Sequence, residues 1–428
     1  MIVERVGKLE DFQSLRAAWN AVYHSDPEAQ FFLSWNWLAG ALETYPGEWM
    51  VLVARGADGS YLGFLPLSRE TVWSKSNRRL CNKIHFAGRL FWADYGGILC
   101  HPDHDEAVLL ALASHLQQMD WSHVSLKNFR ISERRLGIFM EPFADDRLSV
   151  KSLTSLINRG ETDNLVCPLI DLPDSFELYL AETLSSNARQ KTRRMLRRLE
   201  SSSELRITTT SAATRWRDVQ ILEELWYKLW KSRKGSDTQH FASKYRMIIK
   251  RGLDHEMVHM TVLWHGDTPV GALASFIDRD KSRLLFFVGG RDKDFRDLSV
   301  GLVLHTHNIR WAIENGIRTY DLLRGNEPYK YSLGARQHVH LTSRLIRTKS
   351  GRNLNGKLDP GCIGEALRIA EDLAKRELTL EAMAACQQVL ATAPAQEAAK
   401  RLLKVLAEAQ ETRIEAEAQL ASIYRREP

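Results

Sequence analysis

A short segment near residue 300 carries residue types that can hold a phosphorylated ligand. Arg296, Ser299, Val300 and Gly301 stand directly before an apolar stretch with helical spacing, so their backbone should open a helix. The start of a helix exposes unpaired N–H groups and a partial positive charge, which suit a phosphate. The spacing therefore predicts an anion site at these four residues, with an ordinary turn as the alternative.

Three side chains downstream or on that helix could accept a proton. Asp321 and Glu327 stand at either end of a polar loop, and His305 lies on the predicted helix. A positioned carboxylate can act as a general base, and a histidine titrates near neutrality. We expect Asp321 and Glu327 to be the catalytic candidates, with His305 in competition. A loop anchor or an ion pair with Arg324 is the alternative role for Asp321, and a structural role is the alternative for His305.

Polar and aromatic residues in two places could bind a substrate. Arg324, Gly325, Tyr329 and Lys330 crowd the loop after Asp321, where they could bind a hydroxyl, a carboxylate or phosphates. Asp94 and Tyr95 precede two glycines between apolar flanks, and glycine permits close backbone approach. A substrate-facing loop is therefore predicted at Asp94 and Tyr95, with a plain β-turn as the alternative.

The stretch from Tyr320 to Tyr331, YDLLRGNEPYKY, resembles the signature of the CelD/BcsL-type, GNAT-like acetyltransferases of cellulose and polysaccharide biosynthesis, distant relatives of the Fem-type aminoacyl transferases. Ser299-Val300-Gly301 resembles the family's Ser-Pro-Gly turn, with Val300 departing from proline. It also approximates the loop with which GNAT enzymes hold acetyl-CoA, with Ser299 in the place of the first glycine. The resemblance is clearest from Ser185 to Arg347 and does not cover the tail after Pro360.

This resemblance implies direct acyl transfer from acetyl-CoA, the co-substrate, to a hydroxyl or amine of a saccharide or cell-envelope precursor, with help from a general base. It implies that a strand N–H near a bulge, at Val288 or Gly289, polarises the thioester carbonyl. The pantetheine arm would add a strand beside Tyr320 to Leu323. No covalent nucleophile and no metal are expected.

A strongly basic segment leaves two further functions open. Arg189, Lys191, Arg193, Arg194, Arg197 and Arg198 crowd one predicted helix without an intervening acid. This face could bind CoA phosphates, an anionic glycan or a tRNA backbone, or it could simply be solvated. A Fem-type transferase that uses aminoacyl-tRNA is thus the first alternative. The second is a non-catalytic scaffold of a polysaccharide-synthesis complex.

The elements expected around these residues form two similar halves. Each half reads as helices, an antiparallel meander, a helix and a strand. The predicted fold class is α+β, with tandem GNAT-like (acyl-CoA N-acyltransferase) units, mixed and mostly antiparallel sheets, and an all-α tail. The expected boundaries are 1–160 for the N-terminal half, 161–348 for the half with the acyl-CoA site, 349–361 for a linker and 362–428 for the tail.

Composition is that of an ordinary globular protein of 428 residues with a net charge of +6. The five scattered cysteines indicate neither a zinc site nor a disulfide framework. No segment has the length of a membrane span or the form of a signal peptide, so a cytoplasmic location is expected. The tail resembles one tetratricopeptide repeat with a capping helix, which predicts docking on the enzyme or a protein partner. Nucleic acid is not the expected partner.

Overall fold

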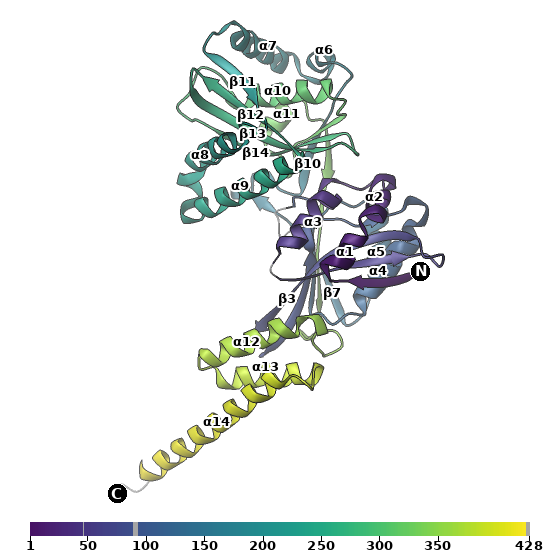
Figure 1. Ribbon diagram of the computed structural model, residues 1–428, viewed down its shortest axis with the longest axis vertical. Coiled ribbons are helices and arrows are strands. Elements are labelled where there is room, and N and C mark those ends of the chain that lie inside the picture. The colour runs from purple at the N-terminus through teal and green to yellow at the C-terminus, as the bar shows by residue number, and fades with distance from the viewer. Residues whose placement is uncertain (46, 89–92, 425–428) are drawn as a thin grey trace. The chain divides into compact units, whose positions relative to one another are not determined.

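The computed structural model describes residues 1–45, 47–88 and 93–424, and its ribbon is shown in Figure 1. The chain forms two compact units. Unit 1 comprises Met1–Glu28, Trp37–Leu153 and Thr342–Pro428, and unit 2 comprises Ala29–Asn36 and Thr154–Leu341. Both units are therefore discontinuous in sequence, whereas the predicted domains were contiguous segments.

Unit 1 is built on a sheet with the strand order β1-β2-β3-β4-β6-β17-β7, in which β5 also pairs with β3. The pairing of β4 with β6 is parallel and the other pairings are antiparallel. The predicted hairpin turn at Asp58-Gly59 joins β2 to β3, and Gly59 has the positive φ of 85° that favours glycine. The strands are β1 (Ile2–Val6), β2 (Glu48–Arg55), β3 (Tyr61–Ser74), β4 (Arg79–Phe86), β5 (Leu99–Cys100), β6 (His123–Phe129), β7 (Leu148–Ser152) and β17 (Thr342–Thr348).

The helices of the N-terminal part are α1 (Leu9–Ser14), α2 (Arg16–Ser25), α3 (Trp35–Thr44), α4 (Asp105–Gln117) and α5 (Glu133–Met140). Helix α5 lies in the polar segment from Ile131 to Gly160, for which the sequence predicts irregular structure. Its inner face carries Arg135, whose guanidinium is buried and lies 2.9 Å from Asp26 and 2.6 Å from Asp105. A charged residue at a core position hides the helical pattern of apolar residues, which explains the missed helix.

Unit 2 repeats this plan with the strand order β11-β12-β13-β14-β15-β10-β16. Here β14 and β15 are the parallel pair, joined through α10, and the other pairings are antiparallel. Its strands are β10 (Val166–Asp171), β11 (Leu205–Thr209), β12 (Val258–His265), β13 (Thr268–Asp278), β14 (Arg283–Arg291), β15 (Thr319–Asp321) and β16 (Gln337–His340), with a small separate hairpin of β8 (Leu156–Ile157) and β9 (Thr162–Asp163). Its helices are α6 (Phe176–Leu178), α7 (Ser186–Ser201), α8 (Arg215–Lys234), α9 (Thr238–Asp254), α10 (Val300–Glu314) and α11 (Pro328–Ser332).

Helices cover both faces of the unit 2 sheet. A side chain at Gly271 would collide with Val300 of α10, whereas one at Gly290 would collide with Trp226 of α8. Gly290 pairs with Ala272, the neighbour of Gly271, and neighbouring residues of a strand point to opposite faces. Helices α8 and α10 therefore pack on opposite faces, as Figure 1 shows.

The two sheets share one arrangement: an antiparallel meander, a parallel neighbour reached through a helix, and two further strands. The predicted α+β class with tandem units, mixed and mostly antiparallel sheets and a helical C-terminal region is confirmed. One expected strand, His338 to Arg347, is divided. Its first part is β16 in the sheet of unit 2, and its second part is β17, which lies between β6 and β7 in the sheet of unit 1.

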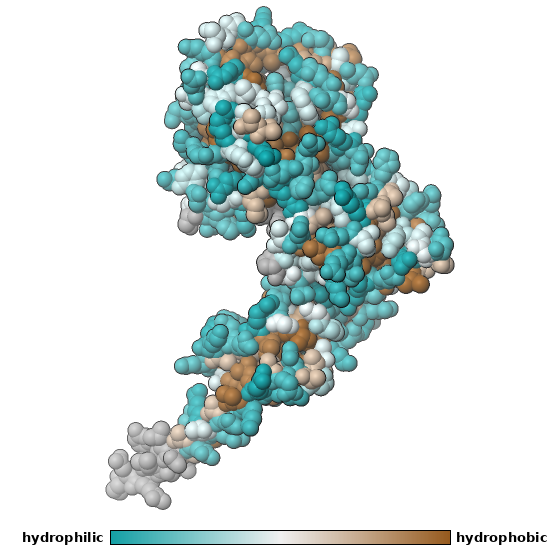
Figure 2. Space-filling model, viewed as in Figure 1, coloured by the Kyte–Doolittle hydropathy of each residue, from teal (hydrophilic) through white to brown (hydrophobic). Residues whose placement is uncertain are grey.

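The tail is helical, as expected, and consists of α12 (Ile363–Lys375), α13 (Thr379–Thr392) and α14 (Glu397–Tyr424). It packs on the ends of β3 and β4, where the Leu80 amide donates to Gln388 Oε1 at 2.7 Å and the Thr71 amide to Glu365 at 2.7 Å. The expected linker is also held on unit 1, because the buried Asp359 carboxylate pairs with Arg69 and, at 2.7 Å, with Arg5. Figure 2 shows an apolar stripe over these helices.

None of the helices in the described ranges is both long enough and apolar enough to cross a membrane.

Candidate functional site

Strands β14 and β15 separate in the middle of the unit 2 sheet. Their parallel pairing covers only Arg283 to Leu285 against Thr319 to Asp321, although β14 continues to Arg291. Within the described residues, the edge of β14 beyond Leu285 has no strand partner on the β15 side. A strand edge of this kind offers backbone N–H and C=O groups to an extended ligand.

A bulge lies in β14 at the start of this unpaired edge. The pairing with β13 passes from Ala274 opposite Val288 to Ser275 opposite Phe286, so Phe287 is the extra residue. A bulge re-aims the groups beside it and is frequent next to active sites. The family resemblance implied a bulge near Val288 or Gly289, and a bulge is present directly beside Val288. Gly290 is needed for a separate reason, the close approach of α8.

Helix α10 begins at the far end of the same edge. Its N-cap is Ser299, and the Ser299 side chain makes no capping hydrogen bond. The N-cap residue therefore leaves the first backbone amides of the helix unsatisfied. A methyl group built at Gly301 would meet no atom within 4 Å. The Val300 side chain is buried and packs at Gly271, so only its backbone amide can serve a ligand. The backbone amides of Val300 and Gly301 therefore stand at the start of the helix, and the space beside Gly301 is free.

The turn before α10 is fixed by helix α7. Leu298 is buried among Met195, Leu199 and Val303, and the Asp297 carboxylate lies 3.5 Å from Arg198. The basic residues near the end of α7 thus stand beside the start of α10. Arg296 is exposed, as a phosphate ligand must be.

Most of the α7 basic residues are exposed as predicted, and two of them contact acids: Arg198, above, and Arg193, which lies 3.9 Å from Glu177. Among the described residues, Lys191, Arg194 and Arg197 have no ion-pair partner. The single predicted helix from Glu177 to Leu199 is interrupted, because a π-helical turn follows α6 and Ser185 caps a new helix by accepting from the Ala188 amide at 3.3 Å.

The loop after β15 is held by a buried lysine. Lys330 is only 2% exposed, and its ammonium donates to the carbonyls of Arg324 at 2.7 Å and Gly325 at 2.8 Å. The same ammonium lies 3.1 Å from Glu327 Oε2. Four acceptors, including the Leu323 carbonyl at 3.4 Å, thus surround one cation. Lys330 was predicted to bind substrate, but burial places its charged group inside the loop.

Asp321 also holds this loop. Its carboxylate is fully buried, and Oδ1 accepts a hydrogen bond of 2.9 Å from the Leu323 amide. Leu323 has a φ of 53°, a left-handed conformation that costs a residue with a side chain free energy. The Asp321 carboxylate and the Lys330 ammonium stabilise this strained turn from both sides. The anchoring role that the sequence left open for Asp321 is therefore present, whereas its role as a base stays a prediction.

Gly325 is buried like Lys330, whereas the other loop residues lie nearer the surface. The Gly325 amide donates to the Val166 carbonyl at 2.8 Å, and Gly325 has a φ of 98°. The Glu327 side chain is 27% exposed, so it is the accessible carboxylate of the pair with Asp321. Tyr329 is exposed on the short helix α11, and Arg324 is half-buried.

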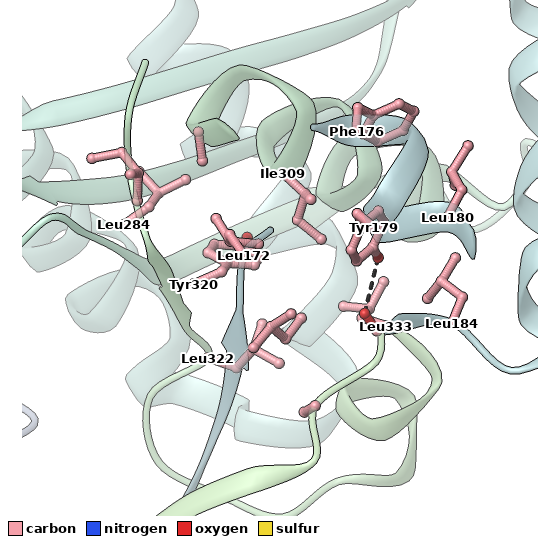
Figure 3. Close-up of a cluster of buried hydrophobic side chains, with 14 of the residues drawn as sticks. Leu172, Phe176, Tyr179, Leu180, Leu184, Leu284, Ile309, Tyr320, Leu322 and Leu333 are labelled. Atoms are coloured by element: carbon pink, nitrogen blue, oxygen red, sulfur yellow. Dashed lines mark hydrogen bonds between the residues drawn. The ribbon is translucent and has the colours of Figure 1, made fainter. Parts of the chain in front are cut away.

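A cluster of buried apolar side chains packs against the start and the end of the loop, at Leu322 and Leu333 (Figure 3). Tyr320 and Leu322 of the β15 region pack there with Ile309 of α10. The Tyr179 hydroxyl donates to the Leu333 carbonyl at 2.9 Å, which ties the end of the loop to the turn after α6. The cluster thus connects α10, β15 and the loop into one rigid support.

His305 belongs to this buried support. It is 5% exposed, its Nδ1 lies 2.8 Å from the Tyr320 hydroxyl, and its ring meets Phe286 edge-on at 4.6 Å. Burial, aided by the Lys330 charge, lowers the pKa of His305 to about 3. Burial also raises the pKa of Tyr320 well above its usual value. Both groups are neutral near pH 7, and a neutral imidazole locked to a phenol is a structural arrangement. The predicted catalytic role of His305 remains untested.

The depressed pKa of His305 should make unit 2 less stable in acid. The unfolded histidine, with a pKa of 6.5, takes up a proton as the pH falls, whereas the folded one resists protonation down to about pH 3. Between pH 7.5 and pH 5 this difference should cost about 2 kcal/mol of unfolding free energy. His259, whose pKa burial also lowers to about 3, should add a similar loss. His305→Gln should remove only the His305 share, as measured by urea unfolding at the two pH values. An unchanged pH dependence in this variant would contradict the assignment.

Asp94 and Tyr95 belong to unit 1, whereas the other candidate site residues belong to unit 2. Tyr95 is fully buried, its ring 5.6 Å from the Arg130 guanidinium, and the Gly96 amide donates to the Asn128 carbonyl at 2.8 Å. Part of the same predicted loop lies outside the described residues. A substrate-facing role for Asp94 and Tyr95 stays a prediction.

Sequence reasoning missed the loop clamp, that is, the contacts by which Asp321 and Lys330 hold the loop after β15. It also missed the aromatic pair at the place where β14 and β15 separate. Phe286 and Phe287 are both half-buried, on opposite faces of β14 where the edge is unpaired. A pair of phenylalanines in an apolar strand gives no signal of this kind. In the described ranges, no group of three His, Cys, Asp or Glu side chains is arranged to hold a metal ion.

Comparison with known protein families gives a match to the part of the chain that carries this geometry. Residues 186–331 match the acetyltransferase (GNAT) domain family, and these residues contain α7, the β12–β15 sheet, α10 and the clamped loop. Comparison with curated protein sequences gave no match.

Solved structures with a similar fold include that of FemX, with a TM-score of 0.57 at 10% identity over 82% of this chain and 98% of that one. A tandem GNAT protein from the clavulanic acid biosynthesis pathway gives a TM-score of 0.44 at 11% identity, over 81% of this chain and 98% of that one. A GCN5-related N-acetyltransferase from Sphaerobacter thermophilus gives 0.35 at 13% identity, over 82% and 96%. The FemX likeness supports the fold, and the family match over residues 186–331 supports a GNAT-like acyltransferase. The chain carries a GNAT-like acyltransferase domain.

Proposed function

We propose that this enzyme transfers an acyl group, most simply acetyl, from acyl-CoA to a hydroxyl or amine of a saccharide or other cell-envelope precursor, as CelD/BcsL-type transferases are expected to do. One observation carries the proposal. The unpaired edge of β14, the bulge at Phe287 and the open start of α10 at Gly301 follow one another along a single strand–turn–helix segment. An extended arm with phosphates at one end and a thioester at the other matches this order.

The donor would bind through backbone groups. The pantetheine arm would pair with β14 beyond Leu285, and its phosphates would meet the amides of Val300 and Gly301. Arg296 is exposed on the same turn and could balance the phosphate charge. The Val288 and Gly289 backbone beside the bulge could polarise the thioester carbonyl as negative charge develops. We assign no covalent intermediate, since acceptor attack on a positioned thioester needs none.

The acceptor side would use the clamped loop. Glu327, the accessible carboxylate, would take the proton as the acceptor oxygen or nitrogen attacks the carbonyl carbon and the C–S bond breaks. Tyr329 and Arg324 would orient the acceptor, and the thiolate would leave as CoA after gaining a proton. Asp321 and Lys330 would act as positioning residues, because they fix the turn that carries Glu327.

The direct test combines calorimetry with a transfer assay. Acetyl-CoA should bind the intact protein with micromolar affinity, and release of free CoA thiol should rise when a suitable sugar or amino sugar is supplied. Longer acyl-CoAs in the same assay would define the acyl chain. Failure of all acyl-CoAs to bind, together with no release of CoA thiol, would contradict the proposal.

The second candidate, a Fem-type transferase that takes its acyl group from aminoacyl-tRNA, is favoured by the exposed face of α7. A polyanion bound there should show a steep salt dependence, since each phosphate contact releases counterions. Replacing Arg194 and Arg197 by alanine should weaken acetyl-CoA binding by about fivefold if these residues serve a CoA phosphate. Arg401→Ala, on the exposed face of α14, is the matched control.

The same pair of variants separates the two donors. Strong, salt-sensitive tRNA retention that the Arg194/Arg197 variant loses, with no acetyl-CoA binding by the wild type, would favour the second candidate. Acetyl-CoA binding that the double variant leaves unchanged would remove α7 from the donor site.

The tail and the location complete the proposal. We infer a cytoplasmic enzyme whose TPR-like tail receives a protein partner. Leu380 and Val405 are exposed on α13 and α14, within the helices that carry the apolar stripe of Figure 2. The predicted boundaries at residues 160, 348 and 361 are kept as a proposal for how these roles divide along the chain.

A further inference from the structure

A groove of about 610 Å³ lies between α8 and α9 in unit 2. The residues that line the groove recur at intervals of three, four or seven residues, so they lie along one face of each helix. From Trp216 to Tyr227 the groove follows α8 for about 16 Å, at a rise of about 1.5 Å per residue. Its volume lies within the range of small-ligand sites. The remaining polar wall residues are Gln220, Glu223 and Glu224 of α8 and Gln239, Arg246 and Lys250 of α9.

This groove is separate from the strand–turn–helix segment assigned to the acyl donor. Helix α8 covers the sheet face at Gly290, whereas α10 covers the opposite face at Gly271. None of the residues assigned to the donor or to the clamped loop lines the groove.

The charges of the groove walls cancel. Glu223 and Arg246 form an ion pair of 3.1 Å across the two helices, and Glu224 accepts from the Gln220 amide at 3.0 Å. With Lys250 the walls hold two formal negative and two formal positive charges. The groove therefore attracts neither a polyanion nor a polycation. It offers instead a row of directional donors and acceptors to a neutral, highly hydroxylated ligand.

Aromatic rings stand at both ends of this row. Trp216 is 46% exposed, which is unusual for a large apolar side chain, and Tyr227 is half-buried. The Lys250 ammonium lies 4.4 Å and the Arg215 guanidinium 4.6 Å from the centre of the Trp216 ring. Arg215 is paired with Asp254 at 3.0 Å, whereas Lys250 has no carboxylate partner in the described part of the chain. A ligand that stacks on this ring from the groove must displace the Lys250 contact, because Lys250 belongs to the groove wall and Arg215 does not. The ring can then receive the polarised C–H groups of a sugar face, which its negative π-surface attracts.

The geometry points to the α8–α9 groove as a binding site for a neutral oligosaccharide, with Trp216 as its stacking platform and Glu224 and the glutamines as its hydroxyl partners. The length of the groove matches a chain of several sugar units rather than one. Its use as an anchor that holds a saccharide acceptor near the enzyme rests on the proposed function. The binding itself does not.

The test uses the full chain and three neutral probes: cellohexaose, maltohexaose and N-acetylchitohexaose. At least one should bind in the micromolar to millimolar range, seen as quenching of tryptophan fluorescence and as saturation-transfer signals on the sugar. Trp216→Ala should weaken that binding by about tenfold. Lys250→Ala should leave it equal or tighter, because one of the two cations over the Trp216 ring is removed. Met247→Ala, an exposed apolar residue of α9 outside the groove, is the matched control.

Three results would overturn the inference: no binding of any probe at millimolar concentration, binding that Trp216→Ala leaves intact, or a preference for polyglutamate that Lys250→Ala abolishes. Acetyl-CoA affinity is measured in every variant and should not change. Failure of acetyl-CoA to bind the wild type would count against the proposed function and leave the oligosaccharide result to decide the groove.

Discussion

Gly301→Glu should weaken acetyl-CoA binding by about 30-fold or more, equivalent to about 2 kcal/mol. The substitution places a carboxylate at the start of α10, where the proposed donor presents its phosphates. The free space at Gly301 means that the new side chain meets no protein atom within 4 Å of its Cβ, so the fold should be preserved. Titration calorimetry of the variant against acetyl-CoA measures the loss.

Gly301→Ala is the matched control for this prediction. It fills the same space without a charge, and alanine in a helix should raise the stability by up to about 1 kcal/mol. Its acetyl-CoA affinity should stay far above that of Gly301→Glu. Equal binding by wild type and Gly301→Glu would show that the phosphates do not lie at this helix start.

Lys330→Met should both destabilise unit 2 and stop transfer. The change removes the cation that holds the carbonyls of Arg324 and Gly325 and leaves the Glu327 carboxylate without its partner. The loss of a buried charge with several acceptors should cost about 3 kcal/mol. Thermal unfolding should then shift down by about 6–12 °C. Because Leu323 is held at a positive φ by the same clamp, the turn should relax and Glu327 should leave its position.

A double-mutant cycle with Glu327→Gln separates the pair from the carbonyl contacts. The amide removes the unpaired charge, so Lys330→Met should cost about 1 kcal/mol less in the Glu327→Gln background. A Lys330→Met protein with wild-type melting temperature and full transfer would contradict the clamp.

Much of the unit 2 core could be predicted from the sequence, because its signals are local. The helix start at Ser299 to Gly301, the meander of three strands and the glycines beside the bulge follow from spacing and residue type alone. The helical tail could be predicted for the same reason, since its composition favours helices locally.

The chemistry of the loop could not be predicted, because it depends on burial. Lysine and aspartate read as ligands for a substrate, yet Lys330 and Asp321 are buried and face their own backbone. The positive φ of Leu323 could not be predicted from the residue type, since leucine rarely adopts a positive φ. Helix α5 was missed for the same reason, because the buried Arg135 is charged and its partner carboxylates are distant in sequence. Non-local pairing decides each of these cases.

Hydrogen exchange with and without saturating acetyl-CoA tests the central claim most directly, because it reads the backbone amides that the donor would engage. We expect slower exchange in two segments, the β14 edge from Phe286 to Gly290 and the first turn of α10 from Val300 to Leu302. In the described residues, the first segment has no strand partner on its β15 side, and the second receives no capping hydrogen bond from the Ser299 side chain. Protection should fall at the α10 turn in Gly301→Glu. Bound acetyl-CoA that leaves both segments unprotected and slows exchange elsewhere would contradict the account.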